Sequence, residues 1–193
     1  ASSDGESWAS QWRRLDQEVT EVVDQAMRND DLWSGQTARL LCQALPDQSC
    51  IHMASSLAVR VVNTCGGTLN EGVDVTANRG VNGIDGTIAT WMGQIQCRQQ
   101  STSVCLIGDL ALLHDAGTML IRAAEFEGDA ARVLVVLDND GGGIFDHLPT
   151  AEHRSAHVPL FVTPPTCDVA SLCRAATEQV VVAEDRATLS DAI

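Results

Sequence analysis

The sequence contains no lysine, so the 12 basic side chains among its 193 residues are all arginines. They are outnumbered by 26 aspartates and glutamates, which gives a formal net charge of −14 at pH 7. An acidic surface repels the phosphate backbone of nucleic acids, so we expect no nucleic-acid partner. In such a chain an arginine beside a candidate site is informative.

Long apolar runs are also absent, and no stretch approaches the length that crosses a membrane. The chain has no C-x-x-C pair, no internal repeat and no low-complexity tract. Because its seven cysteines are odd in number, we interpret them as reduced thiols of a cytoplasmic protein. A zinc site is a weak alternative, since its candidate ligands match no familiar spacing: His147, His153, His157 and Cys167.

Two helices are expected at the start of the chain. Apolar residues recur at helical spacing over residues 8–27, and a second helix is expected over residues 34–44. We interpret residues 1–33 as a helical segment that leads in from another domain. The chain does not begin with methionine, and we expect it to be a piece of a longer protein.

After residue 46, short apolar runs alternate with helical stretches, which is typical of an α/β domain. The expected strands are Cys50–Met53, Val73–Ala77, Val104–Ile107, Val133–Leu137, Leu160–Val162 and Gln179–Val182. The expected helices are Ser56–Thr64, Gly86–Gln96, His114–Ala124, Asp168–Ala175 and one that starts near Asp185. Strands that are apolar throughout indicate a parallel sheet with helices on both faces. Ligands bind such sheets beyond the carboxyl ends of the strands.

Oxygen-bearing side chains and glycines follow two of these strands. Asp109 comes just after Val104–Ile107, and Asp138-Asn139-Asp140 precedes three glycines, 141–143. A carboxylate at the end of an apolar strand is expensive to bury unpaired, so Asp109 either caps the next helix or binds a metal ion. Oxygen ligands suit Mg²⁺, and glycines allow the backbone to approach a diphosphate. The alternative is that the glycines only form turns.

Two arginines follow the other two early strands. Arg60 lies four residues after Ser56, at a strand-to-helix turn whose hydroxyls can cap the helix or hold an anion. Arg79 lies in a loop that contains three glycines, at positions 80, 83 and 86. Taken alone, the first segment is better explained by a capped helix with an exposed arginine, and glycine loops like the second are common in turns, so only their occurrence together indicates a site.

The order of these segments resembles the thiamine-diphosphate motif, in which Gly-Asp is followed, after one strand and one helix, by an Asn pair. Asp109 and Asn139 are 139 − 109 = 30 positions apart, although Leu110 and Asp138 replace the commonest Gly and Asn. The surrounding blocks resemble the family of 2-succinyl-5-enolpyruvyl-6-hydroxy-3-cyclohexene-1-carboxylate synthases (MenD): Ser56-Leu57-x-x-Arg60, Asn78-Arg79-Gly80-x-x-Gly83-Ile84-Asp85-Gly86, Gly108-Asp109-Leu110 and Asn139-x-Gly141-Gly142-Gly143-Ile144-Phe145-x-x-Leu148-Pro149.

The resemblance runs from about residue 34 to the end. It implies that residues 34–193 are the cofactor-binding domain of such an enzyme, cut short at the C-terminus. Mg²⁺, or Mn²⁺ in its place, would be bound by the side chains of Asp109 and Asn139 and by the carbonyl of Gly141. The remaining contacts to thiamine diphosphate would come from Ser56, Ile84, Gly108, Leu110, Gly142 and Gly143.

The resemblance also implies roles in the reaction. Ile84 would hold the cofactor in its reactive, bent conformation. An apolar wall around the reacting atoms would be formed by Ile144, Phe145 and Leu148. Arg60 and Arg79 would bind substrate carboxylates, a task that suits the planar guanidinium group.

The implied reaction belongs to menaquinone biosynthesis: 2-oxoglutarate is decarboxylated and the succinyl carbanion is added to isochorismate. No segment here matches the glutamate that activates the cofactor in this superfamily. The resemblance implies that this glutamate comes from the pyrimidine-binding domain of a partner subunit, in a homodimer or homotetramer. We therefore expect this chain to be inactive alone.

Two rival interpretations remain. The chain could belong to another thiamine-diphosphate decarboxylase or to an acetohydroxyacid-type synthase, but an enzyme for monocarboxylates has less need of both Arg60 and Arg79. It could also be a non-catalytic Rossmann-like binding module in which the glycine loops are simply turns, since a fold alone does not determine function.

Overall fold

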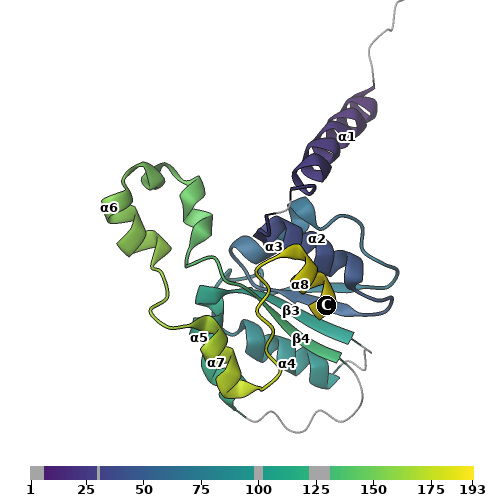
Figure 1. The fold of residues 1–193 in the computed structure, drawn as a ribbon. Coiled ribbons are helices and arrows are strands. Elements are labelled where there is room, and N and C mark those ends of the chain that lie inside the picture. The colour runs from purple at the N-terminus through teal and green to yellow at the C-terminus, as the bar shows by residue number, and fades with distance from the viewer. Residues whose placement is uncertain (1–6, 30, 98–101, 122–130) are drawn as a thin grey trace, which may run out of the picture.

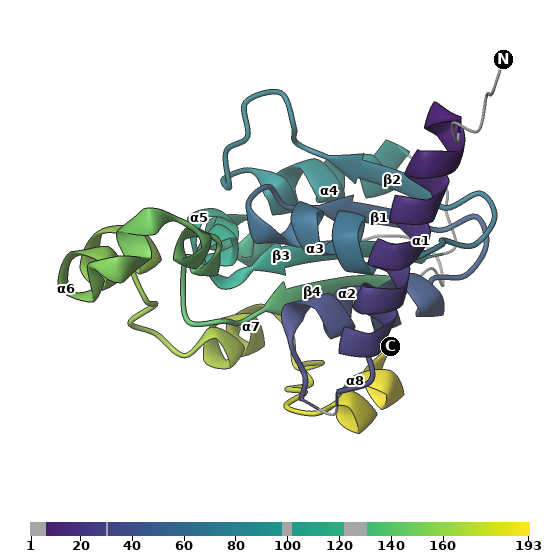
Figure 2. The same ribbon diagram turned by 90° about the horizontal axis from the view of Figure 1, so that it is seen from above.

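A sheet of four parallel strands forms the centre of the computed structural model, which describes residues 7–29, 31–97, 102–121 and 131–193. The strands lie in the order β2-β1-β3-β4, which Figure 2 shows clearly. Their bounds are Cys50–Met53 for β1, Asp74–Ala77 for β2, Thr102–Gly108 for β3 and Ala131–Leu137 for β4. The expected parallel α/β sheet is confirmed, and the first four expected strands are all present.

Helices cover both faces of this sheet (Figure 1). On one face α2 (Ser34–Ala44) packs against α3 (Leu57–Cys65), and α8 (Arg186–Ala192) contacts α2. On the other face α5 (Asp109–Leu120) packs against both α4 (Thr87–Cys97) and α7 (Val169–Ala176). The two central strands are therefore enclosed, and every residue of β1 is buried.

The chain leaves the two central strands in opposite directions. From β1 it passes through α3 to β2, and from β3 it passes through α5 to β4 on the other side. Such a switch in direction opens a crevice beyond the carboxyl ends of the two strands, and ligands bind there in sheets of this kind. The fold therefore points to the segments after β1 and β3.

Two expected strands are wrong. Leu160–Val162 lies in η3 (Val158–Val162), a π-helical turn that continues α6 (Arg154–His157), and Gln179–Val182 has no regular structure. Three or four apolar residues fit a strand and a helical turn equally well, and only the tertiary setting decides between them. Leu160 is exposed, and residues 181 and 182 are exposed as well, so neither run fills a place in the sheet.

Between β4 and α7 the chain makes an excursion of short helices, which projects from the sheet in Figure 1. It consists of η1 (Gly143–His147), η2 (Pro149–Glu152), α6 and η3, and we refer to it as the 143–162 segment. None of these helices was expected from the sequence, because each is only four or five residues long.

Helix α5 begins at Asp109, earlier than the expected start at His114. Strand β3 ends at Gly108, which is also the residue that precedes the helix, so no loop separates the two elements. The expected end of this helix, at residues 122–124, lies outside the described residues. The other expected helices agree with the structure to within one residue at each end.

Helix α1 (Trp8–Ala26) projects from the domain and has no buried residue (Figure 1). Its base is held by an ion pair of 3.0 Å between Arg39 and Asp24. One face carries exposed apolar side chains at helical spacing, which we call the apolar ridge: Trp8, Trp12, Leu15, Val19 and Val22. Among the described helices, none is both long and apolar enough to cross a membrane.

The buried carboxylate of Asp115 connects α5 to α4 on the face of the sheet that these two helices cover. Asp115 of α5 accepts hydrogen bonds from the backbone N–H groups of Ile88 (2.6 Å) and Ala89 (3.0 Å), in the first turn of α4. Its other oxygen accepts a bond of 2.6 Å from the hydroxyl of Thr118. A negative charge at a helix N-terminus is stabilising, and here it comes from a neighbouring helix.

We predict that Asp115→Ala lowers the free energy of unfolding by about 2 to 3 kcal/mol, because it leaves the buried N–H of Ile88 and the partly buried N–H of Ala89 without their acceptor. Urea denaturation followed by circular dichroism measures this loss. Asp191→Ala, at an exposed position of α8, is the matched control and should change stability by no more than about 0.5 kcal/mol. Equal effects of the two substitutions would contradict the capping role.

Candidate functional site

A cavity lies at the crevice between the carboxyl ends of β1 and β3 and extends to the loop after β4. It is bounded by the first turns of α3 and α5, by the glycine loop 141–143 and by one residue of the loop after β2. Its lining includes most of the residues that the sequence pointed to: Ser56, Ile84, Gly108, Asp109, Leu110, Asn139, Gly141, Gly142, Gly143, Ile144 and Phe145.

Asp109 lies at the centre of this arrangement and is 1% exposed. Its Oδ2 accepts a hydrogen bond of 2.6 Å from the backbone N–H of Gly141, and its Oδ1 accepts one of 2.6 Å from Leu110. Burial raises the pKa of this carboxyl group, and nearby Asp138 raises it further, whereas the backbone N–H groups of Gly141, Leu110 and Asn139 act in the opposite direction. No cationic side chain among the described residues pairs with Asp109. A buried carboxylate without a counter-charge is suited to a metal ion.

The glycine loop is tightly covered by the returning chain. A Cβ atom on Gly141 would lie 2.3 Å from the carbonyl oxygen of Val162, and its φ of +113° disfavours any other residue. The N–H of Gly142 donates a bond of 2.7 Å to the same carbonyl. A Cβ on Gly143 would lie 2.4 Å from the amide nitrogen of Asn139. Packing against the backbone therefore requires glycine at position 141, whereas a side chain at position 143 would have to displace the Asn139 amide.

Two helix N-termini meet at the cavity. The residues that precede α3 and α5 are Ser56 and Gly108, and neither makes a side-chain capping hydrogen bond. Ser56 has a φ of +69°, an unusual value for a residue other than glycine. Uncapped helix N-termini attract anions such as phosphate. The cavity thus combines groups for an anion with a carboxylate for a cation, as a metal-bound diphosphate requires.

The apolar side of the cavity comes from two loops. Ile84 belongs to the loop after β2, and Ile144 and Phe145 belong to η1. Leu148, which was expected to share this wall, is 45% exposed and is not among the residues that line the cavity. It follows η1 and begins the turn into η2.

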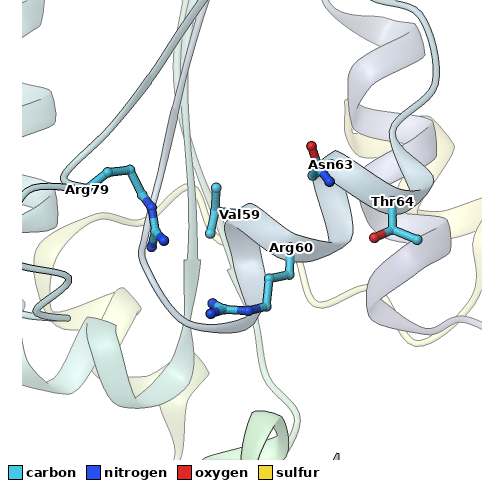
Figure 3. A pocket seen from close by; sticks show the side chains of 5 residues that line it. All are labelled: Val59, Arg60, Asn63, Thr64 and Arg79. Carbon is cyan, nitrogen blue, oxygen red and sulfur yellow. The ribbon is translucent and has the colours of Figure 1, made fainter.

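Arg60 and Arg79 line a second hollow of about 270 Å³ together with Val59, Asn63 and Thr64. In Figure 3 the two guanidinium groups lie at the same end, and the polar residues lie further along α3. Arg60 donates a hydrogen bond of 2.5 Å to the carbonyl of Ser56, and Arg79 donates one of 3.5 Å to the hydroxyl of Ser55.

Neither arginine has a carboxylate partner within the described part of the chain. Two guanidinium groups without counter-charges stand out on a protein with a net charge of −14. Both of their hydrogen-bond acceptors belong to the turn after β1, whose residues Ser55 and Ser56 line the first cavity, so the two hollows are neighbours. The second hollow is suited to an anionic group.

Several lining residues were missed from the sequence. In the main cavity these are Ser55, Leu57, Ala58, Ala111 and Leu137. The hydroxyl of Ser55 donates a hydrogen bond of 3.0 Å to the carbonyl of Asn78, which connects the segments that follow β1 and β2. Its position before Ser56 was a usable signal, whereas the apolar residues carried none. Within the described residues no group of three or more His, Cys, Asp or Glu side chains could hold a metal ion, which leaves the alternative zinc site unsupported.

No family model matches the chain, but curated relatives do. A protein of Rippkaea orientalis is 36% identical over 169 residues, covering 87% of this chain and 28% of the relative. One of Rubrobacter xylanophilus is 41% identical over 158 residues (81% and 26%), and one of Nostoc sp. is 40% identical over 163 residues (84% and 27%). Each is named 2-succinyl-5-enolpyruvyl-6-hydroxy-3-cyclohexene-1-carboxylate synthase. The chain spans little more than a quarter of the length of these relatives.

We predict that Gly141→Ala lowers the free energy of unfolding by about 2 kcal/mol or more, because the new methyl group meets the Val162 carbonyl at a positive φ. Thermal unfolding followed by circular dichroism measures the change. Gly93→Ala is the matched control: a Cβ there meets nothing within 4 Å inside α4, so it should stabilise the helix by up to about 1 kcal/mol. A Gly141→Ala chain as stable as the wild type would show that the loop is loosely packed.

Proposed function

The chain is homologous over 81 to 87% of its length to the 2-succinyl-5-enolpyruvyl-6-hydroxy-3-cyclohexene-1-carboxylate synthases, and on that premise we propose that it is the thiamine-diphosphate- and magnesium-binding domain of such a synthase. The observation that best supports the proposal is the buried Asp109 carboxylate, which has no cationic partner among the described residues and lies in a cavity lined by the first turns of α3 and α5. We assign the cofactor-binding domain to residues 34–193 and the interdomain lead-in to residues 1–33.

The residues of the cavity fit the cofactor. The side-chain oxygens of Asp109 and Asn139 and the carbonyl of Gly141 would hold Mg²⁺ or Mn²⁺, ligands that such hard cations prefer. The N-terminal turns of α3 and α5 and the backbone of the glycine loop would neutralise the diphosphate. When bound, thiamine diphosphate supplies the carbon that accepts the electrons released in decarboxylation.

The apolar residues would set the environment of the reaction. Ile84 would support the cofactor from the loop after β2, while Ile144, Phe145 and Leu148 would keep water from the reacting atoms. An environment with little water strengthens every electrostatic interaction in the site and suppresses side reactions with water. The exposure of Leu148 implies that this part of the wall closes only when a neighbouring domain or a substrate covers it.

The proposed substrates are supported by the hollow that Arg60 and Arg79 line. Arg60 and Arg79 would bind carboxylates of 2-oxoglutarate and isochorismate, both of which are dicarboxylates. The absence of acidic partners for either guanidinium within the described residues supports this assignment. A thiamine enzyme that acts on monocarboxylates would have less use for two unpaired arginines beside one cavity.

The complete active site requires another domain. We propose that the glutamate that activates the cofactor comes from the pyrimidine-binding domain of a partner subunit, in a cytoplasmic homodimer or homotetramer. The exposed apolar ridge of α1 supports the lead-in assignment, because an apolar stripe of this kind normally packs against another element. The chain alone would then bind cofactor weakly and have no synthase activity.

We predict that the chain binds thiamine diphosphate only in the presence of Mg²⁺, and that Asp109→Ala abolishes this Mg²⁺-dependent binding because it removes a metal ligand. Isothermal titration calorimetry at millimolar cofactor, with Mg²⁺ or with a chelator, measures both effects. Asp191→Ala removes the same charge from exposed α8 and should bind like the wild type. Metal-independent binding, or unchanged binding by Asp109→Ala, would remove Asp109 from the proposed metal site.

We predict that Arg79→Ala, in the active synthase that contains this chain, raises the KM for the dicarboxylate substrate roughly 10- to 100-fold, the effect of losing a charged hydrogen bond. Cofactor affinity should be almost unchanged. Arg174→Ala removes an exposed arginine of α7 and is the control. If cofactor affinity fell instead, Arg79 would contact the diphosphate and the substrate assignment would be wrong.

A further inference from the structure

The 143–162 segment is a closed excursion beside the cavity. It leaves the sheet at the glycine loop and returns to the same place, where the N–H of Gly142 bonds to the carbonyl of Val162 at 2.7 Å. A second bond of 2.8 Å, from the N–H of Thr163 to the carbonyl of Val158, ends the π-helical turn η3 at this point. Only the start of this segment, Gly143, Ile144 and Phe145 in η1, lines the cavity. Whatever holds η1 in place therefore also sets the position of the apolar wall.

A buried histidine lies at the centre of the segment. The side chain of His157 is 0% exposed, and both ring nitrogens have partners: Nε2 is 3.0 Å from Oδ1 of Asp146, and Nδ1 is 3.2 Å from Oγ1 of Thr150. A carboxylate can only accept, so Nε2 carries the proton that it donates to Asp146. This hydrogen bond, together with Arg154, holds the pKa of the Asp146 carboxyl below its usual value and keeps it charged. The imidazole thus joins α6 to η1 and η2.

The same imidazole also supports the aromatic side of the wall. Its ring stacks on Phe161, with centroids 5.6 Å apart and planes at 17°. Phe161 in turn meets Phe145 edge to face, at 5.7 Å and 64°. Asp146 is the next residue after Phe145 in the chain. His157 therefore reaches Phe145 by two routes, one through the aromatic pair and one through the Asp146 backbone.

We propose that His157 is a positioning residue, which fixes Phe145 in the cavity wall through Phe161 and Asp146 and so shapes the side of the site that meets the substrate. This inference rests on the proposed function for its catalytic consequence. Its structural content, the coupling of His157 to Phe145, does not depend on any cofactor. The Asp109 centre makes no contact with His157, so cofactor affinity should not follow the substitution.

The coupling can be measured directly, because the chain has only three phenylalanines. Labelling with 4-fluorophenylalanine gives three fluorine signals, and Phe145→Leu and Phe161→Leu assign two of them. We expect His157→Ala to shift the Phe161 signal and to shift and broaden the Phe145 signal. Asp146→Asn, which keeps the size and one acceptor oxygen of the side chain, should change the Phe145 signal less but in the same sense. Circular dichroism confirms that each variant is folded.

Arg154→Ala is the matched control, because it removes the exposed partner of Asp146, at 2.9 Å, and leaves the contacts of His157 with Asp146, Thr150 and Phe161 in place. Its fluorine spectrum should equal that of the wild type. A Phe145 signal that is the same in His157→Ala and Arg154→Ala would overturn the proposal, whether or not the chain binds thiamine diphosphate.

The catalytic consequence is tested in the active synthase that contains this chain. A displaced wall misplaces substrate relative to the reacting atoms, so His157→Ala should lower kcat roughly 10- to 100-fold, with the cofactor concentration for half-maximal activity unchanged. His157→Gln, which retains an N–H donor for Asp146, should recover part of kcat. Altered fluorine signals with normal kcat would limit His157 to a structural role, and loss of cofactor affinity would contradict its separation from the Asp109 centre.

Discussion

The structure around the cavity depends on one buried carboxylate. Asp109 sits where an enclosed strand becomes a helix, and its oxygens accept N–H groups from its own helix and from Gly141, far along the chain. These bonds fix the glycine loop after β4 against the end of β3. They also leave a negative charge in a place where water has little access. The Asp109 carboxylate thus both determines the geometry of the loop and favours a cation beside it.

The charges near the cavity oppose those of the protein as a whole. A chain with a net charge of −14 repels a diphosphate at long range. In the proposed site the attraction for the diphosphate has to be local, and it would come from backbone N–H groups at two helix N-termini. The guanidinium groups of Arg60 and Arg79, which have no acidic partner among the described residues, would attract the substrate carboxylates instead. Since the chain has no lysine, every side chain that provides fixed positive charge is a guanidinium, which stays protonated throughout the physiological pH range.

Most of the strands and many of the residues that line the cavity could be predicted from the sequence, because they depend on local patterns. Enclosed strands are apolar throughout, and parallel strands end at one edge, so Asp109 and Asn139 were expected to meet although they are 30 positions apart. The start of α5 was missed because no loop separates it from β3. Leu160–Val162 was misread because a short apolar run has no distinguishing period.

Other features could not be read from the sequence because they depend on contacts between distant segments. The packing requirement at Gly141 comes from Val162, the acceptor for α4 is supplied by Asp115 of another helix, and the stacking of His157 on Phe161 requires a π-helical turn. The exposure of Leu148 likewise reflects how η1 is oriented, which the family motif does not specify. All of these features depend on tertiary contacts, which local secondary-structure propensity does not encode.

Because the 143–162 segment is closed at its base, its contribution to the apolar wall is separable from the cofactor-binding groups of the same cavity. A loop whose ends are held together by a backbone hydrogen bond can change in length at little entropic cost, about 0.6 kcal/mol for each doubling. Its interior can therefore be rebuilt while Gly142 and Val162 remain paired and the sheet beneath them is unaltered. For protein engineering, this makes the segment suitable for exchange as a unit: a new apolar wall could be grafted beside the proposed metal site, to alter substrate preference while the cofactor-binding groups outside the segment are kept.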